Sequence, residues 1–306
     1  NLNEIVVFNQ PADTLQDMND FTPDRNYYKP IDKKTNLVKR CVAIAGDTLE
    51  IKQGYVYING VQNKLPFRAK LQFSYEVTLK PGKTFERSII QQLKTRYDIT
   101  DGIYATGSKI IIPAASDAAV KVFKNHPSVA SITRYIEPEG NADSGLFPQD
   151  PSYDWNRDFF GPLYIPEEGK TLAINLKNLP VYKRLLTEYE GNSVSTKGNQ
   201  IYINGQLADS YTFKQNYYWM MGDNRHNSID ARAWGFVPFN HVVGKPVFIW
   251  MSWDTNGTGF NKIRWDRVFT TVHPDGERTS YFIPFLVLLA VWWGFNKWRK
   301  RKNATV

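Results

Sequence analysis

The chain has 306 residues, enough for one large domain or two ordinary ones, and its 42% hydrophobic content excludes a globally disordered protein. The net charge is +8, but the cations between residues 297 and 302 carry five of these charges, which leaves no basic patch for nucleic acid elsewhere in the chain. Cys41 is the single cysteine and excludes an internal disulfide. Without a CxxC or HExxH pattern we expect neither a metal site nor a cofactor.

The first part of the chain predicts strands and hairpins. A strand-like run, "EIVVFNQP", ends at Pro11, and residues 36–47 form a second run that ends in a Gly-Asp turn. Residues 48–63 predict a hairpin with Asn59 and Gly60 at a tight turn. A similar unit, "QIYING", recurs later in the chain. We interpret it as the same turn chemistry used twice, the alternative being an internal repeat.

Residues 67–160 alternate strand-like and helix-like patterns, which predicts an inserted α+β subdomain. The expected elements are, in order, a strand at 69–80, a helix at 84–97, a strand at 107–113, a helix at 116–126 and a strand at 128–138. From residue 161 the strand pattern returns, with one helix over 179–191 that begins near Pro180 and ends at Gly191. Residues 1–66 and 161–272 therefore predict one discontinuous β domain, and the fold class is mostly β.

The two ends of the chain carry further signals. The sequence opens at Asn1 directly before a strand-like run, so we expect it to be part of a longer protein. Residues 281–298 carry no charge before Lys297 and are flanked by aromatic residues, which predicts a transmembrane helix with the basic tail 299–306 on the cytoplasmic side. The alternative is a buried C-terminal helix.

The segment "GDNRHNSIDARAWG", residues 222–235, places many charged and amide side chains between two apolar runs. Ser228 and His226 are too weak a pair to suggest a serine–histidine nucleophile, and a G-x-S-x-G elbow is absent. A hydroxyl can also be activated by a desolvated lysine. By strand alternation Lys39 shares a small, apolar face with Cys41 and Ala43, which should lower its pKa. The alternatives are that Lys39 extends to water from an edge strand and that the polar segment is a solvated turn.

Three motifs resemble those of bacterial type I signal peptidases, membrane-bound serine–lysine proteases that remove signal peptides. They are, in order, "EIVVFNQP", "VKRCVAIAGDTLEIKQGYVYING" and "MGDNRHNSIDARAWGFVP". The resemblance covers both ends of the β domain and implies a β-rich catalytic domain of that kind. It does not extend to the insert at 67–160.

The resemblance also implies roles for individual residues. Lys39 matches the general base, and Ser228 matches a serine whose hydroxyl orients the lysine amine. Asp230 and Arg232 match a pair that supports the site. The polar segment would then be a frame that positions one lysine, with Ser228 part of that frame and not the nucleophile.

Four further positions match less central features of the family. Asp223 and Arg225 match polar scaffold positions, while Val7 and Val38 imply shallow apolar pockets for small substrate side chains. One departure is Ala231, where the family usually has serine. The other is the nucleophile, which the family carries in a Ser-x-x-Pro motif ahead of the first strand, so we expect it before Asn1.

The resemblance implies a serine endopeptidase at the bacterial cytoplasmic membrane, with its catalytic domain on the outer side. Its expected partners are the signal peptides of preproteins and membrane lipid, and no nucleic acid is expected. A catalytically inactive, membrane-tethered binding protein on the same scaffold is the alternative. A self-cleaving serine–lysine repressor domain is disfavoured because no DNA-binding module is visible.

Overall fold

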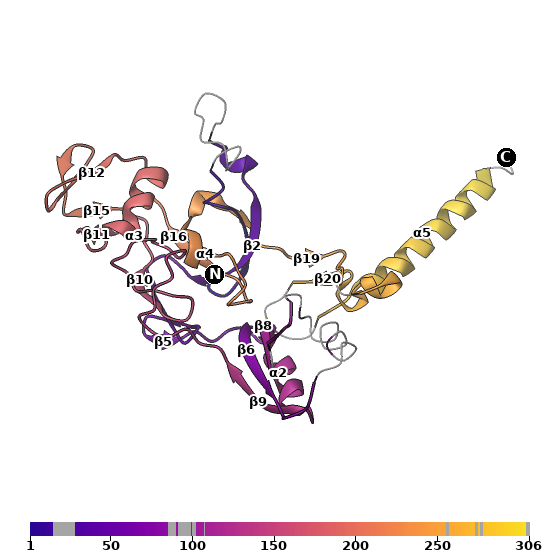
Figure 1. Ribbon diagram of the computed structural model, residues 1–306. Helices are drawn as coiled ribbons and strands as arrows, with labels where there is room; N and C mark the ends of the chain where they lie inside the picture. The colour runs from indigo at the N-terminus through magenta and orange to yellow at the C-terminus, as the bar shows by residue number, and fades with distance from the viewer. Residues whose placement is uncertain are drawn as a thin grey trace.

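The computed structural model describes residues 1–14, 28–84, 90, 99, 102–106, 108–254, 257–272, 275 and 278–303. Strands make up most of the regular structure, which confirms the predicted mostly β class. Figure 1 shows the β-rich body with helix α5 projecting from it.

The central sheet carries the residues of interest and has the strand order β17-β16-β2-β1-β18, with all neighbours antiparallel. Its strands are β1 (Ile5–Asn9), β2 (Asn36–Ala43), β16 (Tyr217–Met221), β17 (Val237–Pro238) and β18 (Val242–Gly244). β1 is rich in β-branched residues and β16 in aromatic residues, both of which favour half-buried strands. Its regular register pairs Val6 with Lys39 and Val7 with Val38.

Two smaller sheets contain the repeated turn. One has the order β10-β3-β4-β5, and the other the order β12-β13-β14. The strands are β3 (Thr48–Lys52), β4 (Tyr55–Ile58), β5 (Val61–Gln62), β10 (Phe160–Tyr164), β12 (Val194–Lys197), β13 (Gln200–Ile203) and β14 (Gln206–Leu207). Asn59 and Gly60 have φ of 52° and 82°, and Asn204 and Gly205 have φ of 54° and 78°. Positive φ at both central residues is what a type I′ hairpin turn requires, so the predicted turn chemistry is confirmed at both places.

The predicted helix over 179–191 is present as α3 (Leu179–Arg184), which continues as a π-helical turn, η2 (Leu185–Tyr189). Proline occupies its first turn, and Gly191 follows it with φ of 71°. Beside it, β11 (Thr171–Ala173) pairs with β15 (Ser210–Thr212).

A separate four-stranded sheet has the order β7-β8-β6-β9. Its elements are β6 (Gln72–Leu79), β7 (Tyr104–Thr106), β8 (Lys109–Ser116), α2 (Asp117–Lys124) and β9 (Val129–Arg134). β6, β8 and β9 match the predicted strands and α2 matches the second predicted helix, whereas the short strand β7 was not predicted. The helix predicted over 84–97 lies almost wholly outside the described residues.

The described residues contain two buried apolar clusters. The larger contains β1, β2, β16 and α3 side chains around Trp219, whose ring lies 5.3 Å from that of Phe236. The smaller is built by residues of β6, β8 and α2, including Val77, Ile112 and Phe123. Phe147 packs in the larger cluster. The boundary of the insert at 67–160 stays a prediction.

The C-terminal region differs from the expectation. It contains β19 (Phe248–Ile249), β20 (Thr270–Thr271) and the helix α5 (Phe282–Asn303). Among the described residues, no helix has the length and apolar character needed to cross a membrane, so the transmembrane helix predicted over 281–298 is not supported. The uncharged part of α5 before Lys297 is only about 22 Å long at 1.5 Å per residue, against about 30 Å of hydrocarbon.

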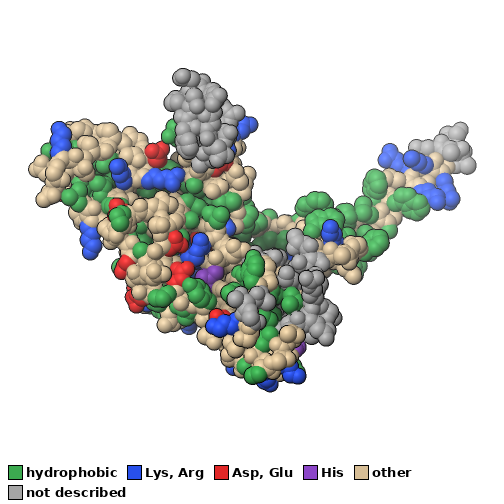
Figure 2. Space-filling view, in the orientation of Figure 1, with side chains coloured by type: hydrophobic (Ala, Val, Ile, Leu, Met, Phe, Trp, Pro, Cys, Tyr) green, Lys and Arg blue, Asp and Glu red, His purple; other side chains and the backbone are tan. Residues whose placement is uncertain are grey.

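The alternative of a buried helix is not supported either. Leu288 is 67% exposed and Trp292 is 63% exposed. Figure 2 shows apolar side chains along α5 and lysines and arginines near its far end.

Candidate functional site

Lys39 and Ser228 meet on the central sheet. Lys39 comes from β2, and Ser228 comes from the loop between β16 and α4 (Ala231–Trp234), 189 residues later. The Lys39 Nζ donates a hydrogen bond of 2.8 Å to the Ser228 Oγ. Burial lowers the pKa of Lys39, which Arg232 lowers further and Asp230 partly offsets. The amine is therefore easier to deprotonate than an ordinary lysine.

Asp230 and Arg232 form the buried support beneath this pair. Both carboxylate oxygens of Asp230 accept from the guanidinium, at 2.9 Å from Nε and 2.8 Å from Nη2. Asp230 also caps the short helix α4 by accepting from the Arg232 backbone N–H, and it accepts from the Gly222 N–H at 3.0 Å. Burial alone would raise the pKa of the Asp230 carboxyl, but Arg232 and these hydrogen bonds outweigh it and hold that pKa below its usual value. The bidentate pair fixes both ends of the loop that carries Ser228.

Asp223 has a partner that the sequence did not suggest. Its carboxylate accepts from Arg40 Nε at 2.8 Å and from Arg40 Nη2 at 2.6 Å. Arg40 also donates to the Asn3 carbonyl at 2.7 Å. Because Arg40 follows Lys39 in β2, the ion pair anchors the start of the loop to the strand that carries the lysine. The adjacent Lys-Arg pair in the sequence was the available signal.

Arg225 is close to fully buried, with 2% of its surface exposed. Its backbone carbonyl accepts from Arg232 Nη2 at 2.6 Å. Within the described part of the chain, its own Nε and Nη1 have no hydrogen-bond partner. Burial, with Arg232 nearby, lowers its pKa to about 10. Arg225 therefore contributes to this frame through its backbone and its packing, while its guanidinium adds positive charge beside Arg232.

Gly222 is a site residue that sequence reasoning missed. A Cβ at this position would lie 2.2 Å from the Ser228 Oγ, 2.6 Å from the Ser228 Cβ and 3.7 Å from the Lys39 Nζ. Any side chain here would collide with the hydroxyl that binds the lysine. The sequence showed only a glycine at the end of an apolar run, which is equally typical of a turn.

His226 connects this loop to the inserted sheet. Its Nδ1 accepts from the Ser74 backbone N–H at 2.9 Å, so the proton of the neutral ring lies on Nε2, which is 3.0 Å from Asp158 Oδ2. Burial would raise the pKa of Asp158, but the His226 contact and the Glu137 N–H lower it overall. Gln72 adds two backbone bonds, from its N–H to the Asp223 carbonyl and from the Arg225 N–H to its own carbonyl. The loop is thus held from the insert side as well.

Val7 and Val38 lie directly opposite each other on β1 and β2. Val38 is 56% exposed. Because side chains alternate along a strand, this pair faces the other side of β2 from Lys39. The structure therefore joins Lys39, Ser228, Asp230, Arg232 and Asp223 in one network, and it leaves the two valines outside that network.

The donor set of this network consists of amine, guanidinium, hydroxyl and carboxylate groups. In the part of the chain that the structure describes, no group of three or more His, Cys, Asp or Glu side chains is arranged to hold a metal ion. A half-buried lysine with a lowered pKa, aligned by a hydroxyl, is suited to accept a proton from a nucleophile.

Comparison with known proteins gives a consistent pattern. The sequence model of the family described as signal peptidase, peptidase S26, matches residues 1–106 and 165–253. A signal peptidase I of Buchnera aphidicola subsp. Acyrthosiphon pisum is 46% identical over 66 residues, 21% of each chain. That of Pseudomonas aeruginosa is 26% identical over 151 residues, 46% of this chain and 50% of its own. That of Leptolyngbya laminosa is 25% identical over 183 residues, 55% of this chain and 86% of its own. This chain thus spans about a fifth of the first relative and half of the second.

Proposed function

The chain belongs to the signal peptidase family, peptidase S26, and on this premise we propose that it acts in a serine endopeptidase that removes signal peptides from exported preproteins. The relatives that it matches are signal peptidases I. The observation that carries the proposal is the 2.8 Å hydrogen bond between Lys39 and Ser228, made by a lysine whose pKa is lowered by burial.

Lys39 acts as the general base. In its neutral form it takes the proton from a serine hydroxyl while that oxygen attacks the scissile carbonyl, and the resulting ammonium then protonates the leaving amine. The lowered pKa increases the fraction of neutral amine at working pH. The lone pair of a general base must point at the hydroxyl that it deprotonates. The Ser228 hydroxyl orients the Lys39 amine by accepting one of its N–H groups.

Ser228 is not the nucleophile in this proposal. Its side chain is buried, with 6% of the residue exposed. Its Oγ contacts Lys39 on one side, and Gly222 packs against it so closely that no Cβ fits between them. A substrate carbonyl would have to enter that space. We place the nucleophile in a Ser-x-x-Pro motif ahead of β1, as the family resemblance implies.

Asp230, Arg232, Asp223 and Arg225 hold the loop in this arrangement. The buried Asp230–Arg232 pair caps α4, and the Asp223–Arg40 pair ties the loop to β2. None of these side chains hydrogen-bonds Lys39, so they hold the geometry of the loop, and Asp230 and Arg232 also act on the lysine through their charges.

The substrate, partners and location follow from the same proposal. We infer cleavage after small residues, with the apolar pair Val7 and Val38 contributing shallow pockets. The partners would be signal peptides of preproteins and membrane lipid, at the bacterial cytoplasmic membrane with the catalytic domain on its outer side. The exposed apolar surface of α5 and its basic end support contact with lipid.

The test is to trap the acyl-enzyme. The chain of residues 1–306 and the same chain extended upstream through the Ser-x-x-Pro motif are incubated with a signal-peptide substrate, and the acylated residue is identified by mass spectrometry. We expect acylation of the upstream serine in the extended protein and little cleavage by residues 1–306. Acylation of Ser228 would overturn the assignment of roles. A folded, extended protein that binds the substrate and never cleaves it would favour the inactive binding protein.

A further inference from the structure

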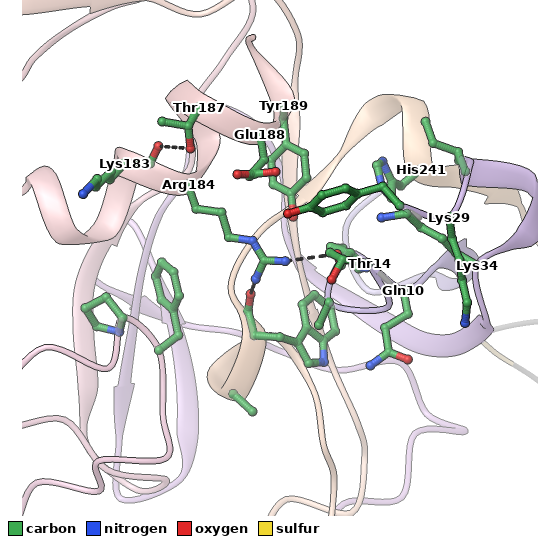
Figure 3. Close-up of a pocket in the computed structure, with 18 of the residues that line it drawn as sticks. Gln10, Thr14, Lys29, Lys34, Lys183, Arg184, Thr187, Glu188, Tyr189 and His241 are labelled. Atoms are coloured by element: carbon green, nitrogen blue, oxygen red, sulfur yellow. Dashed lines mark hydrogen bonds between the residues drawn. The ribbon is translucent and has the colours of Figure 1, made fainter. Parts of the chain in front are cut away.

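The structure contains a large cavity beside the loop that carries Ser228. It measures about 940 Å³ and lies between the end of β1, the segment before β2, the helix formed by α3 and η2, and α4. Figure 3 shows Lys29, Lys34 and His241 on one side and the helix with Arg184 and Glu188 on the other. Neither Lys39 nor Ser228 belongs to its wall, although the neighbouring residue Ile229 does.

The wall has an excess of positive charge. It contains the cations Lys29, Lys34, Lys183 and Arg184, and the carboxylate of Glu188. Lys29 is paired with Asp13, which lies just behind the wall, at 2.7 Å. Counting that pair, four cations stand against two carboxylates, an excess of two. Among the described residues, Lys34 Nζ has no hydrogen-bond or ion-pair partner.

Two buried donors accompany these cations. Tyr189 and Trp234 both belong to the wall, and the Tyr189 hydroxyl and the Trp234 indole N–H are buried without a hydrogen-bond partner in the described part of the chain. Arg184 Nη1 donates to the Trp234 carbonyl at 3.3 Å, which fixes the guanidinium between them. Both donor atoms are buried and do not reach the cavity surface, so the cations of the wall are the groups available to a ligand.

Two residues of the wall have pKa values that are lowered by burial and by neighbouring cations. Burial lowers the pKa of His241 to about 4, with Lys34 and Arg184 adding to the effect. Burial and Arg184 also lower the pKa of Lys34, against the smaller opposing effects of Asp13 and Glu188. A bound anion would compensate the charge that these groups experience.

We propose that this cavity binds a phosphate group, carried either by a small organic phosphate or by the head group of an anionic phospholipid. A phosphate monoester such as glycerol 3-phosphate carries a charge of about −1.5 to −2, and the phosphodiester of a lipid head group carries a single negative charge. An excess of two positive charges can compensate either, and both offer several acceptor oxygens. The volume lies at the upper end of the range for small-molecule sites, about 300–1,000 Å³, so it exceeds the need of an inorganic ion. The apolar side chains of Ile31, Phe147 and Ile229 line the remainder and suit an organic part.

Isothermal titration calorimetry on the purified chain at constant ionic strength tests the proposal. The probes are glycerol 3-phosphate and monomeric dihexanoyl phosphatidylglycerol, with dihexanoyl phosphatidylcholine for comparison. We expect saturable one-to-one binding of at least one of the first two. Tighter binding of phosphatidylglycerol than of glycerol 3-phosphate assigns the phosphate to a lipid, and the reverse assigns it to a soluble metabolite.

Two substitutions with opposite expected signs locate the binding. Lys34→Gln should weaken it about tenfold, the scale of one charge-assisted hydrogen bond. Glu188→Gln should strengthen it several-fold, because it removes the carboxylate that faces the anion, and misfolding cannot produce that gain. Lys124→Gln, on the exposed face of α2, is the matched control and should change nothing.

The proposal is overturned if no probe binds up to about 10 mM, a concentration at which even a weak site would be detected. It is equally overturned if Lys124→Gln weakens binding as much as Lys34→Gln, or if Glu188→Gln leaves it unchanged. None of these results depends on proteolysis, so the proposal and the peptidase function can fail separately.

Discussion

Replacing Gly222 by alanine tests whether the lysine is held by a steric as well as a polar constraint. The new methyl group would lie 2.2 Å from the Ser228 Oγ and 2.6 Å from its Cβ. Since ordinary carbon contacts begin at about 3.5 Å, the Ser228 side chain would have to move by about 1 Å. That displacement breaks or lengthens the 2.8 Å bond to Lys39.

The magnitudes follow from this movement. Overpacking a well-filled interior lowers the free energy of unfolding by about 1–3 kcal/mol. A displacement of about 1 Å at a catalytic group lowers the turnover number about 100-fold. We therefore expect Gly222→Ala to lose about two orders of magnitude in kcat, with a modest loss of stability and a substrate KM close to that of the parent.

The assay combines urea unfolding with signal-peptide cleavage by the full-length enzyme. Gly244→Ala is the matched control, because a Cβ at Gly244 meets nothing within 4 Å. Combining Gly222→Ala with Ser228→Gly removes both clashing atoms, so it should restore stability without restoring turnover. If Gly222→Ala alone turns over substrate like the parent, then the Lys39–Ser228 contact does not orient the base.

Three further outcomes are expected. Lys39→Arg should abolish cleavage, because a guanidinium does not release its proton, and cleavage by the parent should rise with pH through the lowered pKa of Lys39; wild-type turnover by the variant would remove this residue from the mechanism. Arg232→Ala should lower the free energy of unfolding by about 3–5 kcal/mol, because it leaves the buried Asp230 carboxylate unpaired, and activity should fall with it. A stable but inactive Arg232→Ala protein would indicate a direct catalytic role. Burial lowers the pKa of His241 from 6.5 to about 4. The contribution of the neutral ring to the free energy of unfolding is therefore complete above pH 6.5 and is lost as the pH falls toward 4. Because part of the ring borders the cavity, His241→Gln should flatten the pH dependence of urea unfolding in that window by about 2 kcal/mol, and an unchanged slope would contradict the depressed pKa.

The parts of the fold that depend on local pattern could be predicted from the sequence. The two Asn-Gly turns, the helix beginning near Pro180 and the strand carrying Lys39 each rest on a few adjacent residues. The motifs also suggested that Lys39 and Ser228 would meet, and the structure places them 2.8 Å apart.

The remaining site contacts depend on how distant segments are packed. Arg40 pairs with Asp223 across 183 positions, and His226 pairs with Asp158 across 68. Strand alternation gave the face of each residue but could not give its partner on a different element. Gly222 is required by the space around Ser228, which no turn pattern reveals. At the C-terminus, the absence of charge predicts a membrane span, but the uncharged run of α5 is too short for one.

The separation of Lys39 and Ser228 by 189 positions has a consequence for biosynthesis. At about 5–20 residues per second, the ribosome needs about 10–40 s to make the chain between them. During that interval Lys39 has emerged but has no hydroxyl to align its amine, and the loop that would hold it has not been made. In the proposed peptidase, the base therefore stays unaligned until the loop that carries Ser228 has been translated and folded.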